Sequence, residues 1–326
     1  MLKSDKIDVN QILNYIEQLV NIPSPTGLTF EITQYLIDNA KEKNIDFTVT
    51  KKGAVIYKFK SNKDKAEITL LTAHIDTLGA IIKNIKDNEI ELDAIGGYPA
   101  LYIVGDYCKI HTFNNKIIEG TILPKNPSGH ANKKLRNMKV KMEDLYIRCD
   151  LKLEEKEKLE DYVQIGNFIS FDPKYSNRNG FINSRHLDDK SQAAILLYIA
   201  DILNDKTNIS QNVYIYFNVT EETMQGISCI PKEVDNMLII DMGLVADDIN
   251  GDEYSVSICT KDSTGPYNYY LTQKLIKLSQ ENNINYKVAV FTHYGSDGSV
   301  ALLSAHDIKV GLIGPGVSAS HGYERT

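Results

Sequence analysis

The sequence contains few cysteines, and their spacing does not pair them. The four residues are widely scattered and form no Cys-x-x-Cys motif; they are Cys108, Cys149, Cys229 and Cys259. A disulfide scaffold or a thiolate metal site calls for closer and more regular spacing. We therefore expect reduced thiols in a cytoplasmic protein.

Long apolar runs and an excess of positive charge are also missing. No apolar run approaches the roughly 20 residues that span a bilayer, and residues 1–20 lack the apolar core of a signal peptide. The chain carries 43 acidic and 36 basic residues, for a net charge of -7. Since nucleic-acid binding calls for a basic face, the composition predicts neither nucleic-acid nor membrane partners.

What remains is an ordinary globular composition of 326 residues, 42% hydrophobic and 24% charged. Apolar periodicity predicts helices within residues 1–20 and 28–43, and β-branched runs predict buried strands such as 68–73. From Gly79 to Asp172 the pattern changes to short alternating runs. We expect an α/β catalytic domain of residues 1–78 and 173–326, with residues 79–172 inserted as a small β-rich, barrel-like domain.

A His-x-Asp motif, His74 and Asp76, stands at the end of the strand 68–73. Side chains at i and i+2 of an extended segment share one face. A metal-binding imidazole usually donates its other N–H to a carboxylate, which fixes its tautomer. The pair is a candidate ligand with its orienting residue. Alone the motif is weak, because a histidine at a strand end is more often only hydrogen-bonded.

Two acidic pairs also suit a metal site. Asp188 and Asp189 stand where a long buried helix is expected to begin, so they can cap that helix, but a carboxylate there can also bridge two cations. Glu221 and Glu222 follow the predicted strand Val213–Phe217, and neighbouring side chains at a strand end point to opposite sides. One can bind a metal while the other acts as a general base, although a solvated Glu-Glu pair is the simpler interpretation.

Two later strands also lead to possible ligands, Asp241 and His321. In an open α/β sheet, sites collect outside the carboxyl ends of the strands. We expect these residues to meet there: His74, Asp188, Glu222, Asp241 and His321. With Asp188 shared, each of two ions receives three ligands, and such nitrogen and oxygen ligation suits zinc, cobalt or manganese. His111 and His130 are interpreted as surface or structural residues, and His186 as a residue that either supports the ligands or is structural.

The ordered motifs AHIDTLG, HLDDK, EE, LIIDMG, YGSDG and ASHGYERT resemble those of the tetrahedral aminopeptidase family, metallopeptidase family 42, which includes glutamyl and deblocking aminopeptidases. The resemblance covers nearly the whole chain, β-rich insert included. It implies a three-layer α/β/α sandwich with a mixed sheet, and a smaller β domain used in dimerisation and in closing the site. It also implies a homo-oligomer, a tetrahedral dodecamer built from dimers.

The resemblance implies roles for individual residues as well. One ion is held by His74, Asp188 and Asp241, and the other by Asp188, Glu222 and His321. Glu221 becomes the general base, and Asp76 orients His74. The implied activity is hydrolysis of N-terminal residues from short peptides with two divalent ions, zinc or cobalt before manganese.

Two stretches depart from the family pattern, which usually has Glu-Glu-Val-Gly where this chain has Thr223 and Met224. A glycine is also common where this chain has Lys190–Gln192. These changes keep a catalytically idle scaffold open as an alternative. A deacylase of N-acyl amino acids or small amides is a second alternative, because the same metal-bound water can attack any amide. A glycosidase could use paired carboxylates, but the two histidines then have no role. The chain ends five residues after His321, where we expect at least one further element.

Overall fold

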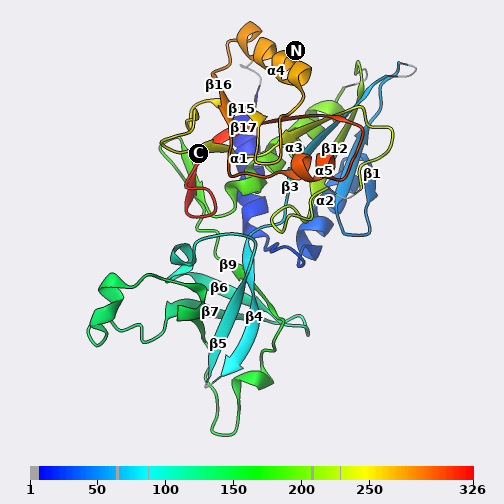
Figure 1. Ribbon diagram of the computed structural model, residues 1–326. Coiled ribbons are helices and arrows are strands. Elements are labelled where there is room, and N and C mark those ends of the chain that lie inside the picture. Colours follow the sequence, from blue (N-terminus) through cyan, green and yellow to red (C-terminus); the bar gives the residue numbers. More distant parts are fainter. Residues whose placement is uncertain (1–6, 64–65, 87, 207–208, 228) are drawn as a thin grey trace.

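The computed structural model describes residues 7–63, 66–86, 88–206, 209–227 and 229–326. Residues 1–6, part of the first expected helix, lie outside this set. The described chain forms a large mixed sheet flanked by helices and, below it in Figure 1, a closed β-barrel. The α/β class and the barrel-like insertion expected from the sequence are confirmed.

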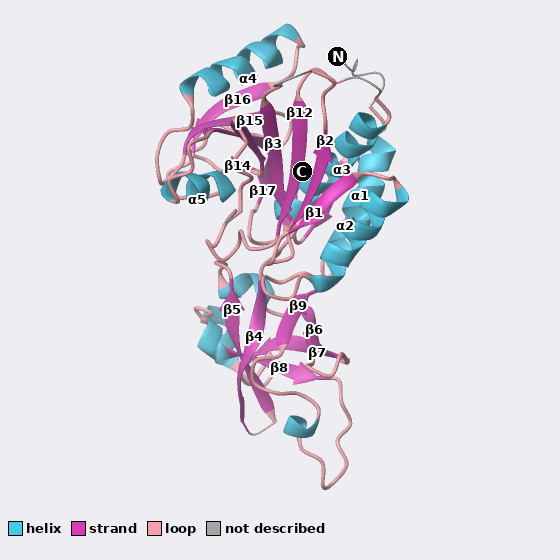
Figure 2. Cartoon of the chain, turned by 90° about the vertical axis from the view of Figure 1, so that its right-hand side faces the viewer, coloured by secondary structure: helices cyan, strands magenta, loops and turns pink. Residues whose placement is uncertain are grey.

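The helices cover both faces of the large sheet. They are α1 (Val9–Asn21), α2 (Phe30–Glu42), α3 (Leu187–Asn204), α4 (Tyr269–Glu281) and α5 (Asp297–Leu303). Figure 2 shows α1, α2 and α3 on one face of the sheet and α4 and α5 on the other. This is the three-layer α/β/α arrangement. Most of α3 is buried, as its apolar sequence predicts, because it packs against both α1 and the sheet.

The large sheet has twelve strands. They are β1 (Asp46–Val49), β2 (Val55–Phe59), β3 (Ile68–His74), β10 (Ser176–Arg178), β11 (Phe181–Ser184), β12 (Asn212–Asn218), β13 (Asn236–Ile240), β14 (Gly243–Val245), β15 (Val256–Lys261), β16 (Tyr286–Val290), β17 (Lys309–Ser318) and β18 (Glu324–Arg325). The main order is β1-β2-β12-β3-β13-β17-β18-β11-β10, with β14, β15 and β16 branching from it.

Four central neighbours, β12, β3, β13 and β17, run parallel to one another. Their side chains are largely buried because helices cover both faces, which explains their continuous apolar runs. Parallel strands end at the same edge of a sheet. The segments that follow β3, β12, β13 and β17 therefore meet at one edge, where the sequence analysis places the candidate ligands.

The barrel closes in the order β4-β5-β8-β7-β6-β9. Its strands are β4 (Gly79–Lys86), β5 (Glu89–Ile95), β6 (Tyr107–His111), β7 (Ile117–Pro124), β8 (Leu145–Cys149) and β9 (Phe168–Phe171). Buried isoleucines such as Ile82, Ile110 and Ile147 give it a hydrophobic core separate from that of the sheet. Between β6 and β7, Asn115 takes a left-handed φ of 61°, which closes a tight hairpin.

Two further observations concern the whole chain. Within the described ranges, no helix is both long and apolar enough to cross a membrane. All four cysteines carry free thiols, as their spacing predicted. A cytoplasmic location stays a prediction.

Candidate metal centre

Asp188 and Asp189 lie in the first turn of α3, but their backbone is not helical. Their φ/ψ angles are −75°/104° and −121°/23°, the peptide between them is cis, and His186 before them is left-handed with φ 72°. Asp188 Oδ1 lies 3.0 Å from His74 Nε2, and Asp189 Oδ2 accepts the backbone N–H of His74 at 2.9 Å. The aspartates therefore contact His74 from the first turn of α3, where the sequence predicts the start of a long buried helix.

His74 ends β3 with its ring held between two acceptors. Nδ1 lies 3.0 Å from the backbone carbonyl of Asp76 and 3.6 Å from the Oδ1 of the same residue. An Nδ1–H donated to that carbonyl leaves the Nε2 lone pair facing Asp188, the arrangement a metal ligand needs. Asp76 thus contacts His74 mainly through its main chain.

The carboxylate of Asp76 instead organises the neighbouring turn. It accepts the N–H groups of Glu221 and Glu222 at 3.1 and 3.3 Å, and the Thr26 hydroxyl at 2.6 Å. Glu221 and Glu222 lie in this turn after β12, a few residues beyond the strand end that the sequence suggested. Asp76 is completely buried, so it fixes the backbone from which both glutamates project.

The two glutamates face different histidines. Glu221 Oε2 lies 3.7 Å from His74 Nε2, whereas Glu222 Oε2 lies 3.6 Å from His321 Nε2. This divergence is the one that the adjacent Glu-Glu pair predicted, although a turn produces it and not a strand. The two carboxylates can therefore serve different purposes.

His321 completes the set from the loop after β17. Its Nε2 lies 3.4 Å from Asp188 Oδ2, and its Nδ1 is hydrogen-bonded to the carbonyl of Gly97, which follows β5 of the barrel. Because His74 contacts Oδ1 of Asp188 and His321 contacts Oδ2, one carboxylate lies between the two imidazoles. A carboxylate shared in this way can bridge two cations.

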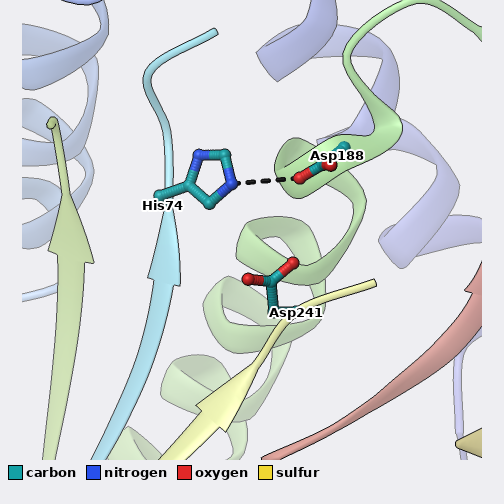
Figure 3. A group of neighbouring side chains, drawn as sticks. All are labelled: His74, Asp188 and Asp241. Carbon is teal, nitrogen blue, oxygen red and sulfur yellow. Dashed lines mark hydrogen bonds and ion pairs between the residues drawn. The ribbon is translucent and has the colours of Figure 1, made fainter. Parts of the chain in front are cut away.

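Asp241, directly after β13, joins the other side of the cluster. The ligand atoms of His74, Asp188 and Asp241 lie within 4.8 Å of one another (Figure 3). All three residues are buried. One Asp241 oxygen accepts the Met242 N–H at 2.6 Å, which fixes the carboxylate. The structure thus brings every predicted ligand to one edge of the sheet.

The buried carboxylates of the cluster hold their protons unusually strongly. Burial, followed by the negative charge of Asp188, raises the pKa of Glu222 to about 8 and that of Asp241 to about 7. Burial also raises the pKa of Glu221 well above its usual range. Bringing several carboxylates together away from water is unfavourable unless protons or cations compensate them.

The histidines and Asp188 show the complementary behaviour. Burial alone lowers the pKa of His321, but its contacts with Asp188 and Glu222 raise it to about 11. Contacts with Asp188 and Asp76 likewise raise the pKa of His74 well above its usual value, against the effect of burial. Hydrogen bonds to both histidines lower the pKa of Asp188, although burial opposes them. Divalent cations can replace these protons, so the donor set fits a metal centre.

A cavity of about 400 Å³ opens onto the cluster. Its polar lining includes Asp188, Glu221 and His321, and its apolar lining includes Met224 and Met242. The centre is therefore accessible to a small substrate from one side. Of the two departures from the family pattern, only the one at Met224 reaches this cavity. Lys190 is fully buried, and its Nζ donates to the Ile22 carbonyl at 2.6 Å.

The three histidines that the sequence analysis set apart from the ligands lie outside the cluster. His111 is half-buried in the barrel and contacts the Ser170 hydroxyl at 2.8 Å, and His130 is exposed. His186 is buried, and burial lowers its pKa well below its usual value. Their placement agrees with surface or structural roles.

Sequence reasoning assigned no individual role in the centre to several residues that lie in or near it. Asp189 and Glu324 both bind backbone N–H groups of candidate ligands. Asp297 is buried and accepts a hydrogen bond from the Asn218 amide at 2.6 Å, and Tyr294 lines the cavity beside Asp241. The only sequence signals were proximity to a candidate ligand for Asp189 and Glu324, and the YGSDG motif for the other two.

The fold and the centre together define a class: an α/β protein with a histidine and carboxylate cluster for divalent cations at its parallel strand ends. The family of M42 glutamyl aminopeptidases matches residues 53–326. The chain belongs to this family and is therefore a peptidase, as the motifs suggested.

Individual relatives agree with this assignment. The Bacillus subtilis (strain 168) protein named "Putative aminopeptidase YhfE" is 40% identical over 323 residues, covering 98% of this chain and 93% of its own. An aminopeptidase from the archaeon Desulfurococcus kamchatkensis has a similar fold, with a TM-score of 0.84 at 19% identity over 97% of this chain and 90% of its own.

The TET1 peptidase of Pyrococcus horikoshii also shares the fold. Its TM-score is 0.80 at 21% identity, over 96% of this chain and 94% of its own. That protein is described as able to assemble into a tetrahedron or a large octahedral shell. At this identity the likeness shows the fold alone.

Proposed function

We propose that this chain is a dinuclear metal-dependent aminopeptidase that removes N-terminal residues from short peptides. The observation that carries the proposal is the placement of Asp188, whose two oxygens face His74 and His321 separately. This shared carboxylate supports two adjacent cation positions. Family membership supports peptide-bond hydrolysis.

The residues that would hold the ions divide around Asp188. His74, Asp188 and Asp241 would hold one ion, and Asp188, Glu222 and His321 the other. Two imidazoles and three carboxylates, without thiolates, suit zinc or cobalt and also accept manganese. When bound, the ions polarise the scissile carbonyl and lower the pKa of the attacking water.

Glu221 would act as the general base. Its carboxylate lies beside His74, lines the cavity and takes no part in the inner histidine–aspartate cluster. Burial raises its pKa well above the usual range, which favours a group that takes up a proton from water and returns it to the leaving amine. Asp76 would position both this glutamate and His74 through its buried contacts.

The acidic cavity supports a substrate with a free amino group. Of the lining carboxylates, the proposal leaves Glu221 without an ion, and its negative charge favours the α-ammonium group of a peptide. An N-acylated substrate has no such charge. This favours an exopeptidase that acts at the N-terminus over a deacylase.

The domain division and assembly belong to the same proposal. We propose residues 1–78 and 173–326 as the catalytic domain and residues 79–172 as an inserted domain that helps to close the site. The contact between His321 and Gly97 supports the second role. The assembly described for the Pyrococcus horikoshii peptidase supports a homo-oligomer, and we propose a tetrahedral dodecamer built from dimers.

The test is amino-acid release from short peptides with free and acetylated N-termini. Protein loaded with zinc, cobalt or manganese is compared with a chelated control. We expect release of the first residue from free peptides only, and its loss on chelation. Cleavage restricted to acetylated substrates would instead establish a deacylase, and no cleavage despite confirmed metal loading would establish an idle scaffold.

A further inference from the structure

Met224 has a backbone conformation that favours glycine. It has a φ of 59° and closes the turn after β12 through a hydrogen bond from its N–H to the Glu221 carbonyl at 2.8 Å. Bulky residues are uncommon in this left-handed region, where a Cβ is crowded by the backbone. Such conformations gather at functional sites. A methionine here calls for an explanation from its side chain.

The side chain of Met224 lies on the wall of the substrate cavity. It is 60% exposed although it is large and apolar, and it lines the cavity together with Glu221. A Cβ placed on Gly295 would lie 3.2 Å from Met224 Cε and 3.5 Å from Sδ. The absence of a side chain at Gly295 therefore leaves room for Met224 to lie along the wall.

Met224 belongs to an apolar wall of the cavity. Met242, Leu244 and Tyr294 are the other members of this wall, which we call the methionine wall. Among the described residues that line the cavity, none is lysine or arginine. A carboxylate side chain on a substrate would meet no lysine or arginine there, and the basic side chains of the lining are the histidines His293 and His321. An apolar side chain could bury surface against the wall.

We infer that Met224 is a specificity-determining residue and that the enzyme prefers peptides beginning with leucine or methionine over peptides beginning with glutamate. The inference rests on the proposed aminopeptidase function. It separates this chain from the glutamyl preference in the description of its family. Flexible thioethers suit such a wall because they adapt to substrate side chains of different shape.

The experiment measures kcat/KM on four peptides that differ only in their first residue: leucine, methionine, alanine or glutamate. The wild type should favour leucine over glutamate by at least about tenfold, the scale of a hydrophobic pocket that accepts or rejects a side chain. The Met224→Gly variant should lower the leucine-to-alanine ratio about tenfold, mainly through KM, because it removes ground-state contact with the side chain. Met224→Lys should raise the glutamate-to-leucine ratio.

A matched control separates the effect of losing the Met224 side chain from the effect of placing glycine at a left-handed backbone position. Asn283 is exposed, lies outside the cavity lining and has a similar φ of 52°. Asn283→Gly should leave all four rates unchanged. Met224→Gly should melt no lower than the wild type, because glycine tolerates the left-handed backbone.

Three results would overturn the inference. One is a wild type that cleaves the glutamate peptide faster than the leucine peptide. Another is a Met224→Gly variant that loses stability and all four activities in equal proportion, since this shows a structural role. The third is an unchanged leucine-to-alanine ratio in that variant. If no peptide is cleaved, the proposed function fails first, and the preference falls with it.

Discussion

The two sides of the metal centre are built in different ways. We call His74, Asp188 and Asp241 the inner group and Glu222 with His321 the outer pair. The inner group is buried, and its residues sit at the ends of β3 and β13 and at the start of α3. In the outer pair, the His321 side chain is 35% exposed and lies in the loop after β17.

The difference shows two ways to fix a ligand. The sheet fixes His74 and Asp241. His74 ends β3, Asp241 directly follows β13, and these two strands pair with each other. His321 depends on two single contacts, one with the Gly97 carbonyl in a distant segment beside the barrel and one with Glu324 on β18, three residues further along the chain. We therefore expect changes around the outer pair to affect metal binding without unfolding the sheet.

The largest expected effect comes from Glu221→Gln, which separates catalysis from metal binding. Removing a general base typically costs about 10² to 10⁴ in rate. Since Glu221 is outside both the inner group and the outer pair, the number of ions bound should stay the same. Peptide turnover and metal content, measured on one preparation, check both statements.

Glu222→Gln is the matched control for this change. It replaces the adjacent residue of the same turn, but that residue contacts His321. We expect it to weaken binding of the ion at the outer pair. If Glu221→Gln keeps a nearly full rate, or loses its metal as Glu222→Gln does, the assignment of the base is wrong.

A smaller effect is expected from Glu324→Gln, which tests how the outer pair is held. The Glu324 carboxylate is buried and accepts the His321 N–H at 2.9 Å and the Asp188 N–H at 3.0 Å. Glutamine offers one carbonyl oxygen, and its amide would turn a donor toward the second N–H. Residues that orient ligands typically contribute about 10- to 100-fold to metal affinity. Calorimetric titration of the metal-free variant with zinc measures this loss.

Glu253→Gln provides the control, because Glu253 lies in the turn before β15 and contacts the same strand, β18. Glu253 pairs with Arg325, which follows Glu324, at 2.7 Å and lies away from the cluster. Its replacement should disturb β18 without changing zinc affinity. Equal losses of affinity in both variants would show that β18 acts only as a structural element.

The inner group could be predicted from sequence because its signals are local. His74 and Asp241 each follow a short buried run, and runs of this type end at one edge of a parallel sheet. The parallel neighbours β12, β3 and β13 then bring segments far apart in the chain together. The same logic found Glu222, although a turn and not the strand itself directs its side chain.

The contacts that hold the outer pair could not be predicted in this way. His321 meets Gly97 across 224 positions of sequence, and Glu324 meets Asp188 across 136. Neither pairing leaves a periodic pattern in the chain. The non-helical backbone at Asp188 was missed for a related reason, because tertiary contacts with His74 override the helix start that the local sequence suggests.

The smallest expected effect is a pH dependence of stability in the metal-free protein. Folding raises the pKa of Glu222 to about 8 and that of Asp241 to about 7, so the folded state binds more protons than the unfolded chain between about pH 4 and 8. Stability then falls as the pH rises through this window. The pKa of His321 is also raised, to about 11. Above about pH 6.5 this residue therefore also makes stability fall as the pH rises. Lys190 has the opposite effect above about pH 7. Burial lowers its pKa to about 7, so the unfolded chain binds more protons there and stability rises with pH.

The comparison between wild type and Glu222→Gln separates these contributions, since Lys190 is the same in both. We expect the melting temperature of the chelated wild type to fall more steeply from pH 5 to 9 than that of the variant. Added zinc should reduce the difference at high pH, because the cation replaces the protons held by the cluster. If the melting temperatures of the two chelated proteins fall equally steeply with pH, Glu222 does not hold a proton in the folded state. The outer pair would then differ from the inner group in exposure but not in charge.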